Sequence, residues 1–269
     1  MADDMVLFLG THRATWLQEP GPPLMVSLNC LPISKTYQAN TDWFCDSGGF
    51  TELQKHGRWR TSVTEHIDRC RHAQQAGRMI YCSPQDWMCE PAVIQGGSIG
   101  LLKFAGTGRT VAAHQHLTVE NFLHLRSEAP DVPFIPVLQG WEVDDYHRCA
   151  DLYEAAGVDL RSESLVGVGS VCRRQSLREA TVIMSTLSER GYRLHGFGFK
   201  QAGIEACWPY MASADSMAWS YNARARGNGC GGRRSCSNCR HEALDWYAKT
   251  VGFVGSVVQP SLFEEARRG

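Results

Sequence analysis

A carboxylate and a hydroxyl precede two glycines at the point where an apolar segment ends. Residues 45–50 read Cys-Asp-Ser-Gly-Gly-Phe and follow a Trp-Phe pair. If that segment is a buried strand, Asp46 lies at its carboxyl end, where α/β barrels hold their catalytic groups. Gly48 lacks a Cβ atom, so the chain can turn sharply there and a flat ligand, with Phe50 stacked on it, can approach the backbone closely. The alternative is an ordinary Ser-Gly-Gly turn without a function.

Three cysteines and a histidine form a second group of candidate functional residues. Cys236 and Cys239 have the Cys-x-x-Cys spacing whose short loop lets two thiolates bind one tetrahedral ion, and Cys230 is a natural third ligand. His241 is the only histidine after residue 195, which makes it the default fourth ligand, although another residue or water can complete the site. We expect a structural Zn²⁺ ion, with a redox Cys-x-x-Cys pair as the alternative.

Arginines surround the cysteine cluster, and residues 216–241 contain no acidic residue. The candidate phosphate-binding arginines are Arg224, Arg226, Arg233 and Arg234. A zinc-binding basic lobe over residues 222–245 would grip the phosphates of a nucleic acid, whereas a solvated loop would use these arginines only for solubility. We favour the phosphate-binding lobe because the chain as a whole has a formal net charge of only −1.

The composition narrows the class of protein. The chain has 269 residues, which is the usual length of a single α/β barrel. No apolar run approaches the roughly 20 residues needed to span a membrane, and the acidic start lacks the positive charge of a secretory signal. Eleven cysteines, an odd number, argue against a disulfide framework. We therefore expect a cytoplasmic protein with no membrane partner.

Short apolar segments of strand length alternate with helical patterns. The predicted strands are Val6–Leu9, Leu24–Cys30, Asp42–Cys45, Met79–Cys82, Phe134–Leu138, Ser164–Gly169, Arg193–Gly198 and Asp215–Trp219. The predicted helices begin at the capping box Ser62-x-x-Glu65 or cover Asp144–Ala156, Leu177–Arg190 and Glu242–Thr250. This alternation predicts an α/β fold, a (β/α)8 TIM barrel in one domain over residues 1–269, with the zinc-binding lobe near its C-terminus. Glycine-rich residues 96–108 are expected to be a loop, with a mobile flap as the alternative.

Taken in order, these motifs resemble the tRNA-guanine transglycosylase superfamily. That superfamily joins an Asp-Ser-Gly-Gly-Phe motif, here residues 46–50, to a later strand aspartate, here Asp215. An Asn-Ala-Arg turn, here Asn222–Arg224, and a cysteine zinc site follow. Residues 137–140 resemble a strand end whose glutamine contacts the base, and residues 166–169 resemble a strand end whose glycine backbone faces the base.

The chain also departs from the superfamily pattern. Its cysteines have the spacing Cys-x5-Cys-x-x-Cys instead of Cys-x-Cys-x-x-Cys, and the usual distant zinc histidine is absent. These features and the short chain look more like the compact DpdA-type enzymes of phages and bacteria, which insert 7-deazaguanines into DNA. The resemblance therefore implies DNA as the partner, with tRNA as the alternative, and a free 7-deazaguanine such as preQ0 as the second substrate. For a phage protein, the location would be the host cytoplasm.

The resemblance also implies roles for individual residues. Asp215 would attack the nucleoside C1′ to form a covalent glycosyl-enzyme, and Asp46 would act as general acid and then as general base. The residues that would contact the base are Ser47, Gly48, Phe50, Asp86, Gln139, Gly167 and Gly169, with Glu90 as second choice to Asp86. His195 is expected to be a core histidine, with ligand contact as the alternative. A homodimer or an accessory DNA-opening partner is compatible with these roles. Two other functions compete with this one: non-catalytic nucleic-acid binding by a zinc-stapled protein, and glycoside hydrolysis.

Overall fold

The computed structural model describes residues 5–171, 177–226, 230 and 235–258. The strands are β1 (Val6–Thr11), β2 (Leu24–Ser27), β3 (Trp43–Asp46), β4 (Met79–Cys82), β5 (Gly97–Ile99), β6 (Leu102–Phe104), β7 (Val137–Leu138), β8 (Val166–Val168), β9 (Leu194–Gly196) and β10 (Ser213–Ser216). The α-helices are α1 (Gly49–His56), α2 (Val63–Gln74), α3 (Pro91–Gln95), α4 (Val111–Glu128), α5 (Val143–Ala155), α6 (Leu177–Glu189), α7 (Gln201–Cys207), α8 (Ala218–Arg226) and α9 (Arg240–Val258). Short 3-10 turns occupy Ala14–Gln18, Leu28–Cys30 and Trp208–Tyr210.

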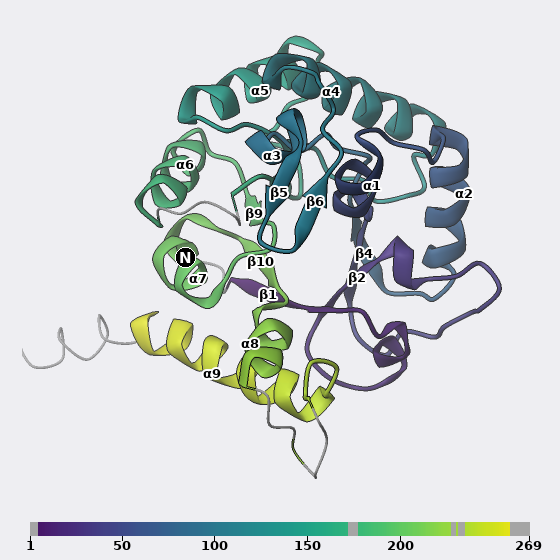
Figure 1. Cartoon of the computed structure of the whole chain (residues 1–269), viewed down its shortest axis with the longest axis vertical. Coiled ribbons are helices and arrows are strands. Elements are labelled where there is room, and N and C mark those ends of the chain that lie inside the picture. Colours follow the sequence, from purple (N-terminus) through teal and green to yellow (C-terminus); the bar gives the residue numbers. More distant parts are fainter. Residues whose placement is uncertain (1–4, 172–176, 227–229, 231–234, 259–269) are drawn as a thin grey trace, which may run out of the picture.

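Eight strands form one parallel sheet that curls on itself inside a ring of helices (Figure 1). Their order is β4-β3-β2-β1-β10-β9-β8-β7, so β1 and β10, the first and last strands of the sheet in the chain, are neighbours. Phe8 of β1 pairs with Asp215 of β10, and Ser27 of β2 pairs with Asp46 of β3. Because every pair is parallel, the carboxyl ends of the strands share one side of the sheet, and the loops that follow them meet there.

The edge strands β4 and β7 approach each other through a single bridge. Cys82 of β4 donates its backbone N–H to the carbonyl of Pro133 (2.8 Å) and accepts the N–H of Ile135 (3.1 Å). These bonds pair Cys82 with Phe134, three residues before β7 begins. The α/β class and the parallel sheet of eight strands are therefore confirmed, with a curled sheet whose edges are joined by one bridge.

Seven of the eight predicted strands have somewhat different bounds in the structure, and two of them end three residues before the predicted end. The strand predicted over Asp215–Trp219 is β10, which begins at Ser213 and ends at Ser216, where the Ser216 hydroxyl accepts the N–H of Ala218 (3.2 Å) and the chain turns into α8. The strand predicted to extend to Cys30 is β2, which ends at Ser27. In both places a serine side chain accepts a backbone N–H two residues later, which favours a turn over further strand.

The remaining differences concern helices and the glycine-rich segment. Ser62 caps α2 as predicted, since its hydroxyl accepts the N–H of Glu65 (3.2 Å). Residues 96–108, expected to be a loop, contain the antiparallel hairpin β5–β6. The long helix α4 was not predicted. No helix in the described part of the chain is long and apolar enough to cross a bilayer.

Apolar side chains fill the concave side of the sheet and its outer side. Phe8, Met25, Phe44, Ile135 and Leu165 are buried together on the inside. A larger cluster lies between the outer side of the sheet and the helices. A packed interior of this kind holds the strand ends rigidly, so the side chains and loops at those ends have fixed positions.

Candidate active site

Asp46 and Asp215 lie at the carboxyl side of two strands that are separated by β1 and β2. Asp46 is the last residue of β3, and Asp215 is the third of the four residues of β10. Backbone N–H groups bind both carboxylates, from Gly48 to Asp46 Oδ2 (3.1 Å) and from Gly198 to Asp215 Oδ1 (2.7 Å). The Nε2 atom of the buried His195 lies 3.5 Å from the same Asp215 oxygen. These contacts hold the Asp215 carboxyl group in a defined position.

Burial raises the pKa of Asp46 above its ordinary value. A hydrogen bond with Ser27 opposes the rise, the negative charge of Asp215 adds to it, and the N–H of Gly48 again opposes it. Because the net direction is upward, Asp46 keeps a proton more readily than an exposed carboxyl group does. The charge of Asp215 contributes to this rise, so the two carboxyl groups interact.

A chain of hydrogen bonds joins Asp86, Gln139, Ser170 and Glu90. Gln139 Nε2 donates to Asp86 Oδ2 (2.5 Å), and the Ser170 hydroxyl lies 2.7 Å from Gln139 Oε1 and 2.8 Å from Glu90 Oε2. These residues follow β4, β7 and β8, so three strand ends contribute to one network. Burial raises the pKa of Asp86 to about 7, the bond from Gln139 opposes the rise, and the charge of Asp46 adds to it.

Ser170 joins the two halves of this network. It accepts the backbone N–H of Cys89 (2.9 Å) and has one hydroxyl hydrogen, which it can give to Glu90 or to Gln139 but not to both. Because the pKa of Asp86 is raised to about 7, its carboxyl group can present either an acceptor or a donor to a ligand near neutral pH.

Gly167 and Gly169 make room for neighbouring side chains. A Cβ atom on Gly169 would lie 2.2 Å from Gln139 Nε2, and one on Gly167 would lie 2.5 Å from the ring of Phe197. The Gly169 carbonyl also accepts the hydroxyl of the buried Tyr146 (2.9 Å). Both glycines thus leave space for side chains near the carboxyl ends of β7, β8 and β9. Their contact with a base stays a prediction.

The Asp-Ser-Gly-Gly-Phe segment forms the turn from β3 into α1. Gly48 has a φ of +77°, and a Cβ atom there would lie 2.3 Å from the Asn29 amide, so both conformation and space require glycine. Ser47 is buried and its hydroxyl accepts the N–H of Gly49 (3.3 Å). Phe50 lies in the first turn of α1, with its ring edge-on to Phe104 of the hairpin at 5.9 Å between centroids. The structure thus places Phe50 in a packing contact, and its predicted ligand contact stays a prediction.

The three cysteines come together as predicted. The Sγ atom of Cys230 lies 3.2 Å from that of Cys236 and 3.3 Å from that of Cys239, somewhat closer than the roughly 3.8 Å that Zn–S bonds of about 2.3 Å give in a tetrahedron. Hydrogen bonds to the thiols of Cys236 and Cys239 raise the pKa of Cys230 to about 11, and their charges add to the rise. Three thiols with this geometry fit a metal ion. Among the described residues the group contains only these cysteines, and His241 lies exposed at the second position of α9.

The predicted phosphate-binding arginines are described only in part. Arg224 lies exposed on α8, and Arg226 is the last residue of that helix. Arg233 and Arg234 lie outside the described residues. The helix that carries Arg224 is fixed to the cysteine cluster, since Ala223 packs on Cys236 and Cys239 and the Ser220 hydroxyl donates to the Ser237 carbonyl (2.6 Å).

Comparison with known proteins gives one match over nearly the whole chain. The model of the DpdA family, described as DeoxyPurine in DNA protein A, matches residues 3–266. The chain belongs to the DpdA family. The resemblance seen in the sequence is thereby confirmed at the level of this family. A search of curated proteins found none that matches the chain.

In this DpdA-family chain, sequence reasoning underrated two residues of the site and passed over a third. His195 was expected to be a core histidine; it is buried, but it also lies beside Asp215, with Nδ1 2.8 Å from the Ser213 hydroxyl. Glu90 was second choice to Asp86, and both belong to one network. Ser170 was not considered, although it is the junction of that network and has a φ of +57°, an uncommon conformation for a residue other than glycine. No local motif marks Ser170, because its partners lie 31 and 80 residues away.

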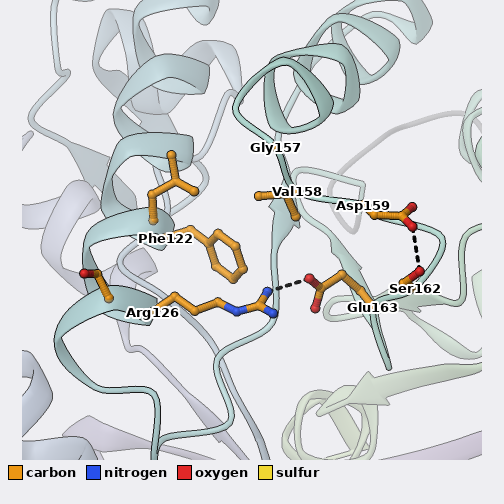
Figure 2. Close-up of a pocket in the computed structure, with 9 residues that line it drawn as sticks. Phe122, Arg126, Gly157, Val158, Asp159, Ser162 and Glu163 are labelled. Atoms are coloured by element: carbon orange, nitrogen blue, oxygen red, sulfur yellow. Dashed lines mark hydrogen bonds and ion pairs between the residues drawn. The ribbon is translucent and has the colours of Figure 1, made fainter.

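A cavity of the DpdA-family chain lies away from these residues. It has a volume of about 450 Å³ and is bordered by α4 and by the segment that leads from α5 to β8 (Figure 2). That segment precedes its strand, so the cavity lies at the amino ends of the strands, opposite the two aspartates. An ion pair between Arg126 and Glu163 (2.5 Å) lies across it, and Ser162 binds Asp159 (2.6 Å). We do not assign the reaction to this cavity, because the amino ends of barrel strands typically serve stability.

Proposed function

We propose that this chain exchanges guanine in DNA for a 7-deazaguanine. The observation that carries the proposal is the pair Asp46 and Asp215, which lie at carboxyl strand ends with interacting charges in a chain of the DpdA family. A two-step exchange at a sugar carbon requires one carboxyl group that can carry a proton, and the raised pKa of Asp46 suits that role. The description DeoxyPurine in DNA favours DNA over tRNA as the polymer.

In the first step, a carboxylate oxygen of Asp215 forms a bond to C1′ while the bond from C1′ to N9 of guanine breaks. The departing base takes the electron pair of that bond and a proton from Asp46. In the second step, the incoming base loses its N9 proton to Asp46, and N9 attacks C1′ as the Asp215 carboxylate leaves. Asp46 thus serves as acid and then as base, as in retaining glycosidases.

The network around Asp86 would read the base in this mechanism. Asp86 and Gln139 offer acceptors and donors, and Ser47, Gly48 and the backbone at Gly169 would complete the pocket. Because the pKa of Asp86 is raised to about 7, its carboxyl group can match either a donor or an acceptor on the base edge. The target nucleotide must leave the base stack to reach these groups, which costs a few kcal/mol in a duplex.

Three further proposals concern the surroundings of the site. We propose that the sheet is a closed TIM barrel, which the bridge at Cys82 supports. We propose that Cys230, Cys236 and Cys239 hold a structural Zn²⁺ ion with His241 or another group as fourth ligand. When bound, the ion would stabilise the fold of the lobe and would not take part in the reaction.

The arginines of the lobe would then contact DNA phosphates: Arg224, Arg226, Arg233 and Arg234. An accessory DNA-opening partner or a second copy of the chain would be consistent with this function.

The test is a base-exchange assay. The protein is incubated with guanine-containing DNA or tRNA and isotope-labelled preQ0, and the nucleosides are resolved by mass spectrometry. We expect label in DNA, and its loss in both Asp46→Asn and Asp215→Asn. Asp159→Asn, in the cavity at the opposite end of the strands, is the matched control and should retain exchange. Label in tRNA alone would assign the chain to the other substrate, and label in neither polymer would contradict the proposal.

A further inference from the structure

The tip of the β5–β6 hairpin exposes three large apolar side chains. The exposed fractions are 51% for Ile99, 103% for Leu101 and 45% for Leu102. Ile99 pairs with Leu102, so Gly100 and Leu101 form a two-residue turn, in which Gly100 has a φ of +58°, as the first turn residue of a type II′ hairpin does. Turn positions usually hold polar residues, and clustered apolar side chains in solvent mark a contact surface.

The base of the hairpin is fixed to the candidate active site. Phe104 is buried against Leu53 of α1, and Gln54 of the same helix donates its side-chain N–H to the carbonyl of Lys103 (2.5 Å). The Gln54 carbonyl in turn accepts the N–H of Ala105 (2.9 Å). Because α1 directly follows the turn that contains Asp46, the hairpin is held at a defined place relative to the carboxylates.

The tip lies on the side of the sheet where the reaction is proposed. The hairpin belongs to the connection between β4 and α4, which leaves the carboxyl end of β4. In Figure 1 it projects in front of the strands and inside the ring of helices. A polymer that presents a nucleotide to Asp46 and Asp215 would therefore pass close to Leu101.

The charge around the hairpin fits a polyanion. Residues 91–119 contain no acidic side chain. Exposed basic side chains lie on the hairpin, just after it and at the end of α1: Lys103, Arg109, Lys55, Arg58 and Arg60. A hairpin with an apolar tip and with cations on it and near its base resembles proteins that bind phosphates and insert an apolar side chain between bases.

We propose that Leu101, flanked by Ile99 and Leu102, inserts into the base stack of duplex DNA and fills the space left by the extruded nucleotide. The inference rests on the proposed function, since it assumes that DNA is the substrate. Extrusion leaves an apolar gap in the duplex, and an apolar side chain that fills it lowers the cost of keeping the nucleotide out of the stack. A single strand has no such gap, so the tip contributes to activity on duplex DNA only.

The test compares Leu101→Ser with Val182→Ser on duplex and single-stranded DNA of the same sequence. Val182 is a matched control because it is also apolar and 40% exposed, but lies on the outer helix α6. The readouts are the rate of base exchange and the fluorescence of 2-aminopurine placed beside the target guanine, which rises when the bases unstack. We expect Leu101→Ser to lose at least about tenfold in exchange and most of the fluorescence rise on duplex DNA, since unstacking costs more than a factor of ten. Exchange on the single strand should stay within about twofold, and Val182→Ser should match the wild type on both.

Each other outcome has a defined meaning. An equal loss on both forms of DNA, or no loss on the duplex, would overturn the role of the tip while leaving the exchange function intact. If the wild type exchanges no base in any DNA, the proposed function has failed, and the fluorescence readout alone decides whether the tip unstacks bases. Leu101-dependent binding to anionic lipid vesicles without any unstacking would assign the tip to a membrane surface and overturn the inference.

Discussion

Asp86 gives the sharpest physical prediction, because its raised pKa has a calculable cost. Its carboxyl pKa rises from the ordinary 3.8 to about 7. Between these two values the folded chain keeps a proton that the unfolded chain has released, so the free energy of unfolding falls as the pH rises toward 7. Over the interval from pH 5 to 7 the full effect is about 3 kcal/mol, since one pKa unit corresponds to about 1.36 kcal/mol. The residue is only partly buried by surface area, and solvent screening reduces the expected effect to about 1.5 kcal/mol.

Asp86→Asn removes this cost, because the neutral amide can still accept the hydrogen bond from Gln139. Relative to the wild type, the variant should gain about 1.5 kcal/mol more in free energy of unfolding at pH 8 than at pH 5, measured by urea denaturation. It should also lose base exchange, since an amide at this position cannot change between the donor and acceptor forms of a carboxyl group. Asp159→Asn is the control, because that carboxyl is exposed and a hydrogen bond from Ser162 lowers its pKa, so its effect should be equal at both pH values. A gain for Asp86→Asn that is independent of pH would refute the assignment of a raised pKa.

Two further predictions concern the rim and the cysteine cluster. Gly169→Ala should weaken binding of the free base about tenfold by calorimetry, because its Cβ would displace Gln139 and break a hydrogen bond to a charged group. The control Gly252→Ala, with nothing within 4 Å of the added carbon, should bind the base normally. Equal affinities for both variants would argue against a base-reading role for Gln139. The purified chain should contain one zinc ion by elemental analysis. Cys236→Ser should lose the ion and have a lower melting temperature, whereas Cys30→Ser, outside the cluster, should keep the ion. A wild type without zinc under metal-replete conditions would count against the metal site.

The sequence predicted the elements and the aspartates better than the contacts between them. Asp46 was identifiable because a buried apolar segment ends there and glycines follow. The end of β10 was misplaced because apolar residues continue to Trp219, but Trp219 belongs to α8, where it stacks on Trp16 (5.6 Å) and donates to the Gly10 carbonyl (2.9 Å). An apolar run therefore indicates that residues are buried but not where a strand ends. Here the strand ends where the serine side chain accepts a backbone N–H.

Other features could not be read from local patterns. Helix α4 was missed because several of its buried positions are polar, among them His114, Gln115 and Thr118, and so the apolar period is interrupted. Each of these side chains has a partner outside the helix, as when His114 Nδ1 lies 2.7 Å from the carbonyl of Met88, 26 residues away. The network through Ser170 depends likewise on three loops that meet only in the folded chain. Sequence periodicity therefore does not predict hydrogen bonds between residues that are distant in the chain.

The most direct test of the central claim is the intact mass of the protein after incubation with DNA and no free base. The account predicts that a rapid acid quench traps a covalent adduct of the DNA strand, that peptide mapping places it on Asp215, and that guanine is released in equal amount. Adding free preQ0 before the quench should remove the adduct. An adduct on another residue, or base exchange in DNA that persists in Asp215→Asn, would contradict the assignment of Asp215 as the nucleophile.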